Sequence, residues 1–172
     1  LISSYYAVFE AIENLIKCGH RKIGYIEGLS HLSTTNERIS AYKDAMQRYN
    51  IHTENAFIKY TDNMFKSAIV ATKELLQQKC TAIFVSNNLM SIDVINYLYQ
   101  MGIEPNKNIT IIGFCDSQFG EYFLRNIPKV VQPTIELGHQ AGKQMLERIM
   151  KPEAPIREQI LYSVYKDPIK PT

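Results

Sequence analysis

Two kinds of apolar pattern alternate along this chain. Stretches with an apolar residue at every third or fourth position predict amphipathic helices, and short continuous apolar runs predict strands that are buried on both faces. The helical stretches are residues 5–16, 34–49, 65–76, 92–99 and 135–150, with a short helix expected at 118–124. The apolar runs are residues 22–27, 56–60, 82–85 and 109–114, with a last strand expected at 159–164. Helices and strands therefore follow one another in turn along most of the chain.

Residues that favour helix ends flank the first two helical stretches. Ser3 or Ser4 can cap the first helix, and Gly19 stands where a left-handed residue commonly ends a helix. Thr34 and Glu37 have the spacing of a capping box for the second helix.

The spacing of the strands indicates the fold class. Successive strands are about 25 to 35 residues apart, which is the length of a βαβ unit. Right-handed crossovers between such units place helices on both faces of a parallel sheet. We therefore predict an α/β fold with a doubly wound parallel sheet of at least four strands. Its central, buried residues are expected to be Ile58 and the runs 23–26, 83–85 and 111–113.

Composition narrows the class of protein without assigning a function. The chain has 172 residues, 45% of them apolar and 21% charged, which suits one globular domain with a sizeable core. A formal net charge of +2 gives no electrostatic reason to expect nucleic-acid or membrane binding. The three cysteines (Cys18, Cys80 and Cys115) are scattered without CxxC spacing, so neither a disulfide framework nor a metal site is expected.

The first residues of the chain indicate what kind of protein it belongs to. It has no initiator Met and no basic segment of the kind that begins a signal peptide. Together with the scattered cysteines, this predicts a piece of a longer, cytoplasmic protein.

Polar residues follow four of the predicted strands at their carboxyl ends, where open parallel sheets bind ligands. They are Glu27 and residues 61–63, 86–88 and 115–117. Any one of them could equally cap a helix or form a turn, but four such ends together predict a polar ligand cleft.

Catalytic motifs are missing from the sequence. No GxSxG, HExxH or P-loop pattern occurs. His20 follows a helix-ending glycine, and a structural role there is the better interpretation. Cys115 reads by default as a buried, inert thiol. We therefore expect neither an enzyme nor a cofactor.

Five short motifs occur in a fixed order. They are Leu15-Ile16-x-x-Gly19-His20-Arg21, Arg38-x-x-Ala41-Tyr42, Thr81-Ala82-Ile83-Phe84-x-x-Asn87, Ile112-Gly113-Phe114-x-Asp116 and Val131-Gln132-Pro133. In order and spacing they resemble the effector-binding domain of the lactose/galactose repressor (LacI/GalR) family of transcription regulators. The resemblance runs from about residue 5 to about residue 165.

That resemblance implies one lobe of a two-lobed domain like a periplasmic sugar-binding protein. A small effector, usually a sugar or nucleobase, binds between the lobes and changes the affinity for operator DNA. Residues 1–130 would form the second lobe, residues 131–150 would belong to the first lobe, and residues 151–172 would be a return strand and tail. DNA would be bound through a helix-turn-helix headpiece that this chain lacks. Second-lobe helices would form a homodimer through residues 65–69, 91–97 and 118–123.

The resemblance also assigns ligand-binding residues. They are Arg38, Asn63, Phe65, Asn87, Cys115, Asp116 and Gln132. Arg38 matches an arginine that hydrogen-bonds effector hydroxyls or carboxylates, and it is expected to open the second helix and point at Asn87 and Cys115. Cys115 replaces the family's aspartate, so recognition would rest on Arg38, Asn87 and Gln132 or shift to Asp116. Phe65 is either a residue that stacks on the ligand or part of the core.

Three functions compete for this pattern. The first is a cytoplasmic regulator with a small-molecule effector, and the second is a periplasmic sugar-binding protein that serves transport. The Gly19-His20-Arg21 motif and the Ile112-Gly113-Phe114-x-Asp116 run favour the regulator. The third, an enzyme of doubly wound fold, lacks a catalytic constellation.

Overall fold

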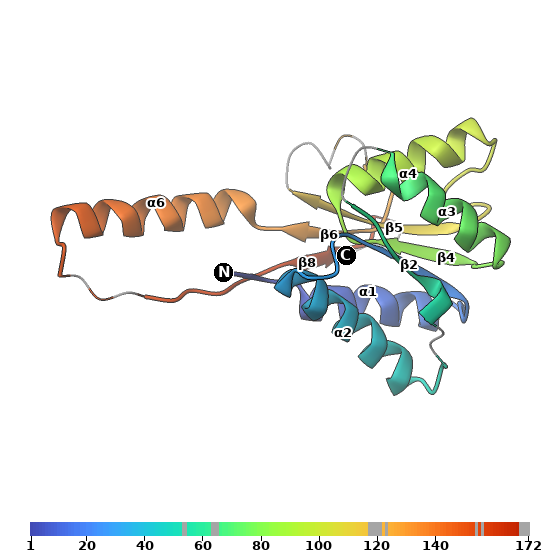
Figure 1. Ribbon diagram of the computed structural model, residues 1–172, viewed down its shortest axis with the longest axis horizontal. Coiled ribbons are helices and arrows are strands. Elements are labelled where there is room, and N and C mark those ends of the chain that lie inside the picture. The colour runs from blue at the N-terminus through green and yellow to red at the C-terminus, as the bar shows by residue number, and fades with distance from the viewer. Residues whose placement is uncertain are drawn as a thin grey trace.

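The computed structural model describes residues 1–52, 55–62, 66–116, 122, 124–153, 155 and 157–168, with Asp116 described in its backbone only. In chain order the strands are β1 (Ile2–Ser3), β2 (Ile23–Glu27), β3 (Ile58–Tyr60), β4 (Ala82–Val85), β5 (Thr110–Asp116), β6 (Lys129–Gln132), β7 (Leu161–Tyr162) and β8 (Val164–Lys166). The helices are α1 (Tyr5–Lys17), α2 (Ser33–Arg48), α3 (Ser67–Gln77), α4 (Asn88–Gln100) and α6 (Thr134–Met150), with a 3₁₀ turn η1 (Asn55–Phe57). Helices α1 and α2 cover one face of the main sheet, and α3 and α4 cover the other (Figure 1).

The main sheet confirms the predicted doubly wound architecture. Its described strands run in the order β3-β2-β4-β5-β6-β8, and every neighbouring pair is parallel except β6 and β8. The predicted buried runs lie in β2, β4 and β5, which are inner strands of this order. Ile58 is buried too, but it lies on β3 at the end of the order, so its predicted central position is wrong.

Each inner strand divides its side chains between two cores, because successive side chains of a strand point to opposite faces. Tyr25, Phe84 and Phe114 pack against α1 and α2 in one cluster. Ile83, Cys115 and the alternate residues of the other strands pack against α3 and α4 in the second cluster. Apolar strands of this kind need cover on both faces, which the two helix pairs supply.

The N-terminus of α1 is capped by a different residue from those predicted. The hydroxyl of Ser4 lies 2.9 Å from that of Ser163 and makes no capping bond. Instead, Oε1 of Glu37 accepts the backbone N–H groups of Ser4 and Tyr5 at 3.1 and 3.2 Å. The predicted capping box in α2 is therefore wrong, because α2 begins at Ser33 and Glu37 caps the neighbouring helix.

The end of α1 follows the prediction. Gly19 adopts φ +95° and Gly19 N–H donates to the carbonyl of Ile16 at 3.0 Å, as in a left-handed helix end. His20 has the structural role expected for it, since its Nδ1 lies 2.9 Å from Oγ1 of Thr81. Arg21 supplies the positive charge at the helix end and donates to the carbonyl of Ile16 at 2.9 Å.

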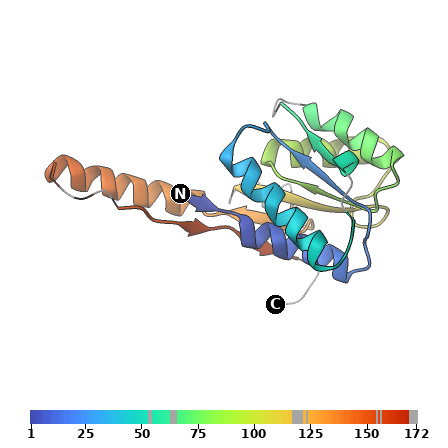
Figure 2. The same ribbon diagram turned by 60° about the horizontal axis from the view of Figure 1, so that its bottom comes forward.

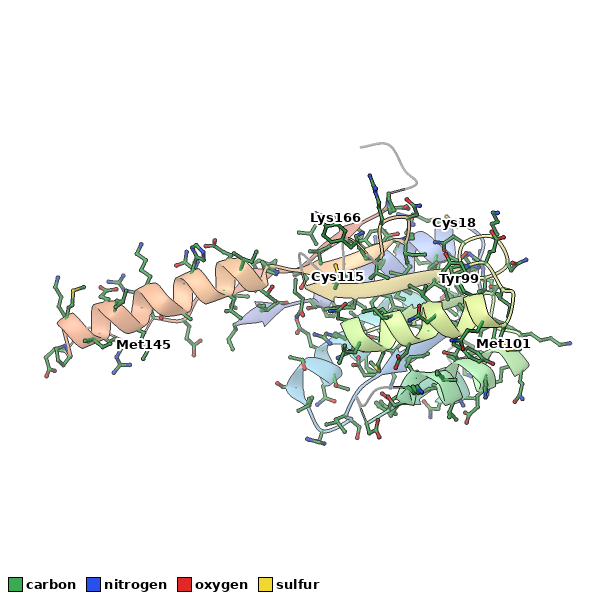
Figure 3. All side chains as sticks on the ribbon, turned by 90° about the horizontal axis from the view of Figure 1, so that it is seen from above. Cys18, Tyr99, Met101, Cys115, Met145 and Lys166 are labelled. Atoms are coloured by element: carbon green, nitrogen blue, oxygen red, sulfur yellow. The ribbon has the colours of Figure 1, made fainter. Side chains whose placement is uncertain are left out.

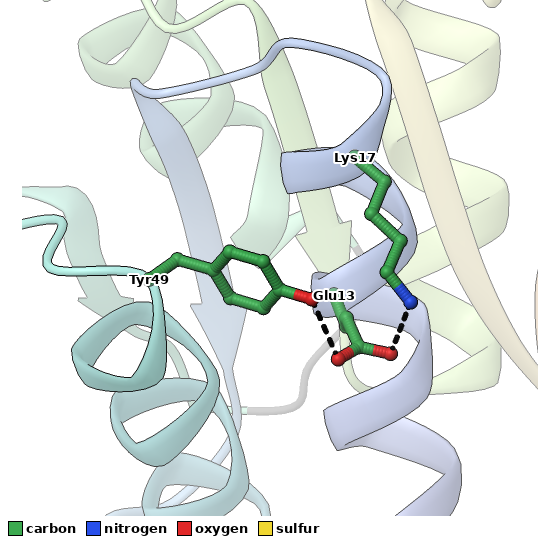
Figure 4. A network of polar contacts seen from close by, with 3 residues as sticks. All are labelled: Glu13, Lys17 and Tyr49. Carbon is green, nitrogen blue, oxygen red and sulfur yellow. Dashed lines mark hydrogen bonds and ion pairs between the residues drawn. The ribbon is translucent and has the colours of Figure 1, made fainter.

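A polar network joins α1 to the end of α2 (Figure 4). The carboxylate of Glu13 accepts a hydrogen bond from the Tyr49 hydroxyl at 2.8 Å and forms an ion pair with Lys17 at 2.7 Å. The hydrogen bond from Lys17, followed by that from Tyr49, lowers the pKa of Glu13. The contact fixes the relative position of the two helices that cover this face.

Two predicted elements have different bounds, and a third is not described. The expected strand at 56–60 begins only at Ile58, because η1 occupies the preceding residues. The expected last strand divides at Ser163, where the chain leaves its pairing with β1 as β7 and joins β6 as β8. The predicted helix at 118–124 lies outside the described residues except at 122 and 124.

Helix α6 stands apart from the rest of the molecule. It projects beyond the sheet, with the returning chain beside it in both views (Figures 1 and 2). None of its residues is buried, and its large apolar side chains are exposed at Ile135, Met145, Leu146, Ile149 and Met150. Such an apolar helix face is typical of an interface with another part of a protein. Of the helices in the described ranges, none is long and apolar enough to cross a membrane.

Candidate ligand-binding site

The carboxyl ends of the parallel strands meet along one edge of the sheet. β2 and β4 are in register at Ile26 and Val85, so Glu27 and Ser86 follow them side by side. β5 and β6 are in register at Asp116 and Gln132. This edge is the usual position for a ligand in an open parallel sheet.

Arg38 reaches this edge from the second turn of α2. Its Nη1 donates to the carbonyl oxygen of Ser86 at 3.0 Å, and its guanidinium carbon lies 4.3 Å from the ring centroid of Phe114. Its Nε is buried and has no hydrogen-bond partner among the described residues. Arg38 therefore points at the strand ends as predicted, although it does not open the helix, which begins at Ser33.

Glu27 is a buried carboxyl beside Arg38 that the sequence analysis counted among the polar strand ends but did not assign as a ligand-binding residue. It is 2% exposed. Oε1 accepts the backbone N–H of Gly28 at 2.9 Å and the hydroxyl of Ser86, and Oε2 accepts the Tyr25 hydroxyl at 3.2 Å. In the sequence, an acidic residue at the end of an otherwise apolar run was the pattern that could have indicated this network.

Burial raises the pKa of Glu27 above its ordinary value. The hydrogen bonds from Ser86, Gly28 and Tyr25 and the nearby charge of Arg38 oppose this effect without cancelling it. Hydrogen bonds from protein donors therefore offset part of the cost of desolvating this carboxyl.

This raised pKa makes the stability of the fold depend on pH. The folded chain keeps a proton on Glu27 at a pH where the unfolded chain has lost it. The stabilisation from the protonated group is therefore complete below the ordinary pKa of a glutamate and is lost as the pH rises through the folded value. Relative to the unsubstituted chain, we expect the unfolding free energy of Glu27→Gln to rise as the pH increases from the ordinary pKa of a glutamate through the raised pKa of the folded chain. Urea titrations across this range measure the difference, and a difference independent of pH would contradict the raised pKa.

Asn87 serves as the N-cap of α4. Its Oδ1 accepts the backbone N–H groups of Leu89 and Met90 at 2.9 and 3.3 Å. The amide oxygen is thus engaged by the helix, and the amide NH₂ group is the part of this side chain that remains for a ligand.

The other predicted site residues are not all brought together. Cys115 is fully buried in the core under α3 and α4 (Figure 3), on the opposite face of β5 from Phe114 and Arg38. The expectation that Arg38 points at the Cys115 thiol is therefore wrong, because adjacent residues of a strand face opposite ways. Gln132 ends β6 and is half-buried. Asn63, Phe65 and the side chain of Asp116 lie outside what the structure describes.

The described residues offer no metal centre at this edge. Nowhere in the described ranges do three or more His, Cys, Asp or Glu side chains gather in a way that could hold a metal ion. Among the described residues of this edge, Arg38 supplies a cation, and the chemistry that they can offer to a molecule bound there is hydrogen bonding.

Known proteins with similar sequences share this architecture. The family profile of the periplasmic binding protein-like domain matches residues 12–166. HTH-type transcriptional repressor PurR of Vibrio vulnificus (strain CMCP6) is 30% identical over 145 residues, covering 83% of this chain and 43% of the relative. The ribose operon repressor of Haemophilus influenzae is 28% identical over 153 residues, covering 88% of this chain and 46% of the relative.

Solved structures agree on the fold. The crystal structure of transcription regulator CcpA of Lactococcus lactis superposes with a TM-score of 0.85 at 22% identity, over 96% of this chain and 62% of that one. This chain spans less than half the length of the two repressors named above. The profile match over most of its residues shows that the chain belongs to the periplasmic binding protein-like domain family.

Proposed function

We propose that this chain is the effector-sensing second lobe of a cytoplasmic LacI-family transcription regulator. A small, sugar-like molecule binds at the strand ends beside Arg38 and changes the affinity of the complete protein for operator DNA. The observation that carries this proposal is the position of the Arg38 guanidinium at the carboxyl ends of β4 and β5, in a chain that is similar to two repressors. One of these relatives is named a ribose operon repressor. Asn87 and Gln132 complete the contacts proposed for this lobe.

The proposal includes a division of the chain between two lobes. Residues 1–130 form the second lobe, residues 131–150 belong to the first lobe, and residues 151–172 return to the second. The exposed apolar face of α6 supports this division, because a helix of that kind is stable when another element covers it. The position of α6 beyond the sheet leaves room for such a lobe around it (Figure 2).

Operator binding by the complete regulator tests the function. The full-length protein should retard a DNA fragment from its own promoter region, and one member of a panel of sugars and sugar derivatives should change the affinity. Thermal shift with the same panel identifies the molecule that binds. DNA binding that responds to no member of the panel would contradict an effector-controlled repressor of this class.

The transport alternative has less support. The two relatives quoted above are named as repressors, and neither name is that of a transport protein. A periplasmic binding protein would bind its sugar without any effect on DNA, so the retardation experiment also separates these two functions.

We also expect the regulator to form a homodimer through second-lobe residues 65–69, 91–97 and 118–123. Large apolar side chains are exposed at Val70 on α3, at Leu89 and Tyr99 on α4, at Met101 just after α4, and at Tyr122, which is 87% exposed (Figure 3 labels Tyr99 and Met101). Exposed apolar patches commonly mark interfaces between subunits. Sedimentation equilibrium should give a dimer, and Val70→Asp should shift it toward monomer. A strict monomer at high protein concentration would contradict this expectation.

A further inference from the structure

Three segments of the chain lie side by side where α6 leaves the main sheet. β1 pairs with β7 in a separate two-stranded sheet, in which Ser3 is opposite Tyr162. The chain passes from β7 through Ser163 into β8, where Val164 is opposite Val131 of β6. β6 in turn leads into α6, which projects beyond the sheet (Figure 1). We call residues 1–4, 131–134 and 161–164 the connecting segments.

The connecting segments are the place where the two lobes can move relative to each other. In the division of the chain proposed above, α6 belongs to the first lobe, so the chain passes between the lobes at the end of β6 and at β7. Motion between two bodies is absorbed by a few residues of the segments that connect them. A group that holds these segments to one lobe therefore limits the motion.

Glu37 of α2 holds the first connecting segment to the second lobe. Its Oε1 accepts hydrogen bonds from the hydroxyl of Ser3 and from the backbone N–H groups of Ser4 and Tyr5, the last two at 3.1 and 3.2 Å. Hydrogen bonds to a carboxylate are charge-assisted and stronger than those between neutral groups. Glu37 is thus a strong attachment for the backbone of this segment.

The first segment is tied in turn to the last one. The hydroxyl of Ser4 lies 2.9 Å from that of Ser163, and the backbone N–H of Ser163 donates to the carbonyl of Ser3 at 2.9 Å. Ser4 is 2% exposed and Ser163 is 7% exposed, so water does not compete freely for these contacts. Through Ser4, the carboxylate of Glu37 acts on both segments.

The same helix carries Arg38 into the proposed effector site. Arg38 follows Glu37 directly, and its Nη1 donates to the carbonyl of Ser86 at the end of β4. Successive residues of an α-helix point about 100° apart, so Glu37 reaches the connecting segment while Arg38 reaches the strand ends. A shift of α2 that moves one of these side chains also moves the other.

We propose that Glu37 is a positioning residue that couples the effector site to the angle between the lobes. Its hydrogen bonds keep the connecting segments in one arrangement relative to α2, and a molecule bound beside Arg38 changes that arrangement by moving α2. Operator affinity follows the angle between the lobes, because an equilibrium shifts toward the arrangement whose contacts are favoured. This inference rests on the proposed function and identifies the residue through which the site is coupled to DNA binding.

Pulsed dipolar spectroscopy on the full-length regulator measures the distance between the lobes. One spin label is placed at Gln77→Cys, at the end of α3, and the other at Lys151→Cys, directly after α6. Both positions are exposed. Cys18 is exposed as well and is replaced by serine, whereas Cys80 and Cys115 are buried. Glu37→Ala should broaden or shift the distribution of this distance.

Operator retardation without effector measures the consequence for DNA binding. Glu37→Ala should change the affinity for the promoter fragment by at least about fivefold, the lower end of common coupling effects. Glu37→Gln keeps an acceptor oxygen without the charge, so both of its changes should be smaller than those of Glu37→Ala.

Glu13→Ala is the matched control. Glu13 also joins α1 to α2, through the Tyr49 hydroxyl at 2.8 Å, but at the other ends of these helices (Figure 4). Its loss should leave the distance between the lobes and the operator affinity unchanged. Urea unfolding of both variants gives their stability, which a purely structural role of Glu37 would lower without moving the distance.

Each other outcome overturns a defined part of the argument. If Glu37→Ala leaves the distance unchanged, or Glu13→Ala changes it as much, Glu37 is not a positioning residue while the effector-sensing function stands. A changed distance with an unchanged operator affinity contradicts the coupling to DNA. If the unsubstituted regulator does not retard the fragment, the proposed function is wrong, whatever the distances show. Should Glu37→Ala fail to fold, Glu37→Gln decides, and an unchanged distance there contradicts the proposal.

Discussion

Arg38→Ala in the full-length regulator should raise the effector concentration needed for half of the operator response by roughly ten- to over a hundredfold. The reason is the loss of a charged hydrogen bond to a bound ligand, which costs about 1.5–3 kcal/mol. The fold should remain intact, because Arg38 is half-buried and, among the described residues, makes one hydrogen bond, to the carbonyl of Ser86. Operator retardation at increasing effector concentration measures the response, and urea unfolding checks stability.

Two further variants identify what Arg38 contributes. Arg38→Lys keeps the charge but loses the planar fork, so it should recover only part of the response. Arg48→Ala removes an arginine from the same helix at a distance from the strand ends and should leave the response unchanged. An unaltered response in Arg38→Ala would remove Arg38 from the site.

Phe84→Ala should lower the unfolding free energy by about 3–5 kcal/mol. Phe84 is fully buried on the inner strand β4, and its ring stacks on that of Tyr25 at 5.1 Å between centroids. Alanine would leave a cavity between the sheet and the α1–α2 layer, which the close-packed neighbours can fill only in part. Since single domains are stable by about 5–15 kcal/mol, this is a large share of the total.

Chemical denaturation of the two chains gives this difference directly. Tyr6→Ala is a suitable control, because Tyr6 is an aromatic residue of α1 that is 71% exposed. Its substitution should change the unfolding free energy by less than about 0.5 kcal/mol. A loss below about 1 kcal/mol in Phe84→Ala would mean that the core around β4 is not packed as described.

The candidate site was predicted in part. The position of Arg38 at the strand ends was predicted from the resemblance to the repressor family, and its contact with Ser86 agrees with that prediction. The face on which Cys115 lies was not predicted, although the alternation of a strand starting from the buried Phe114 contained that information. Glu27 was noted as a strand end, but its three donors come from β2, the following turn and the end of β4, so its network exists only after the sheet has formed.

Local sequence patterns determined the helices and strands of this protein, and long-range contacts determined which groups cap the helices and which strands pair. Apolar runs bounded by turns predicted β2, β4 and β5, and Gly19 predicted the end of α1, because these depend on burial and backbone conformation within a few residues. Glu37 had the spacing to cap its own helix, yet it caps α1, which only the packing of α2 against α1 brings within reach. The division of the last strand at Ser163 likewise depends on two partners, β1 and β6, that are far away in sequence. Side chains determine secondary structure locally. The partner of a carboxylate or of a strand edge, in contrast, is the group that the completed fold places beside it.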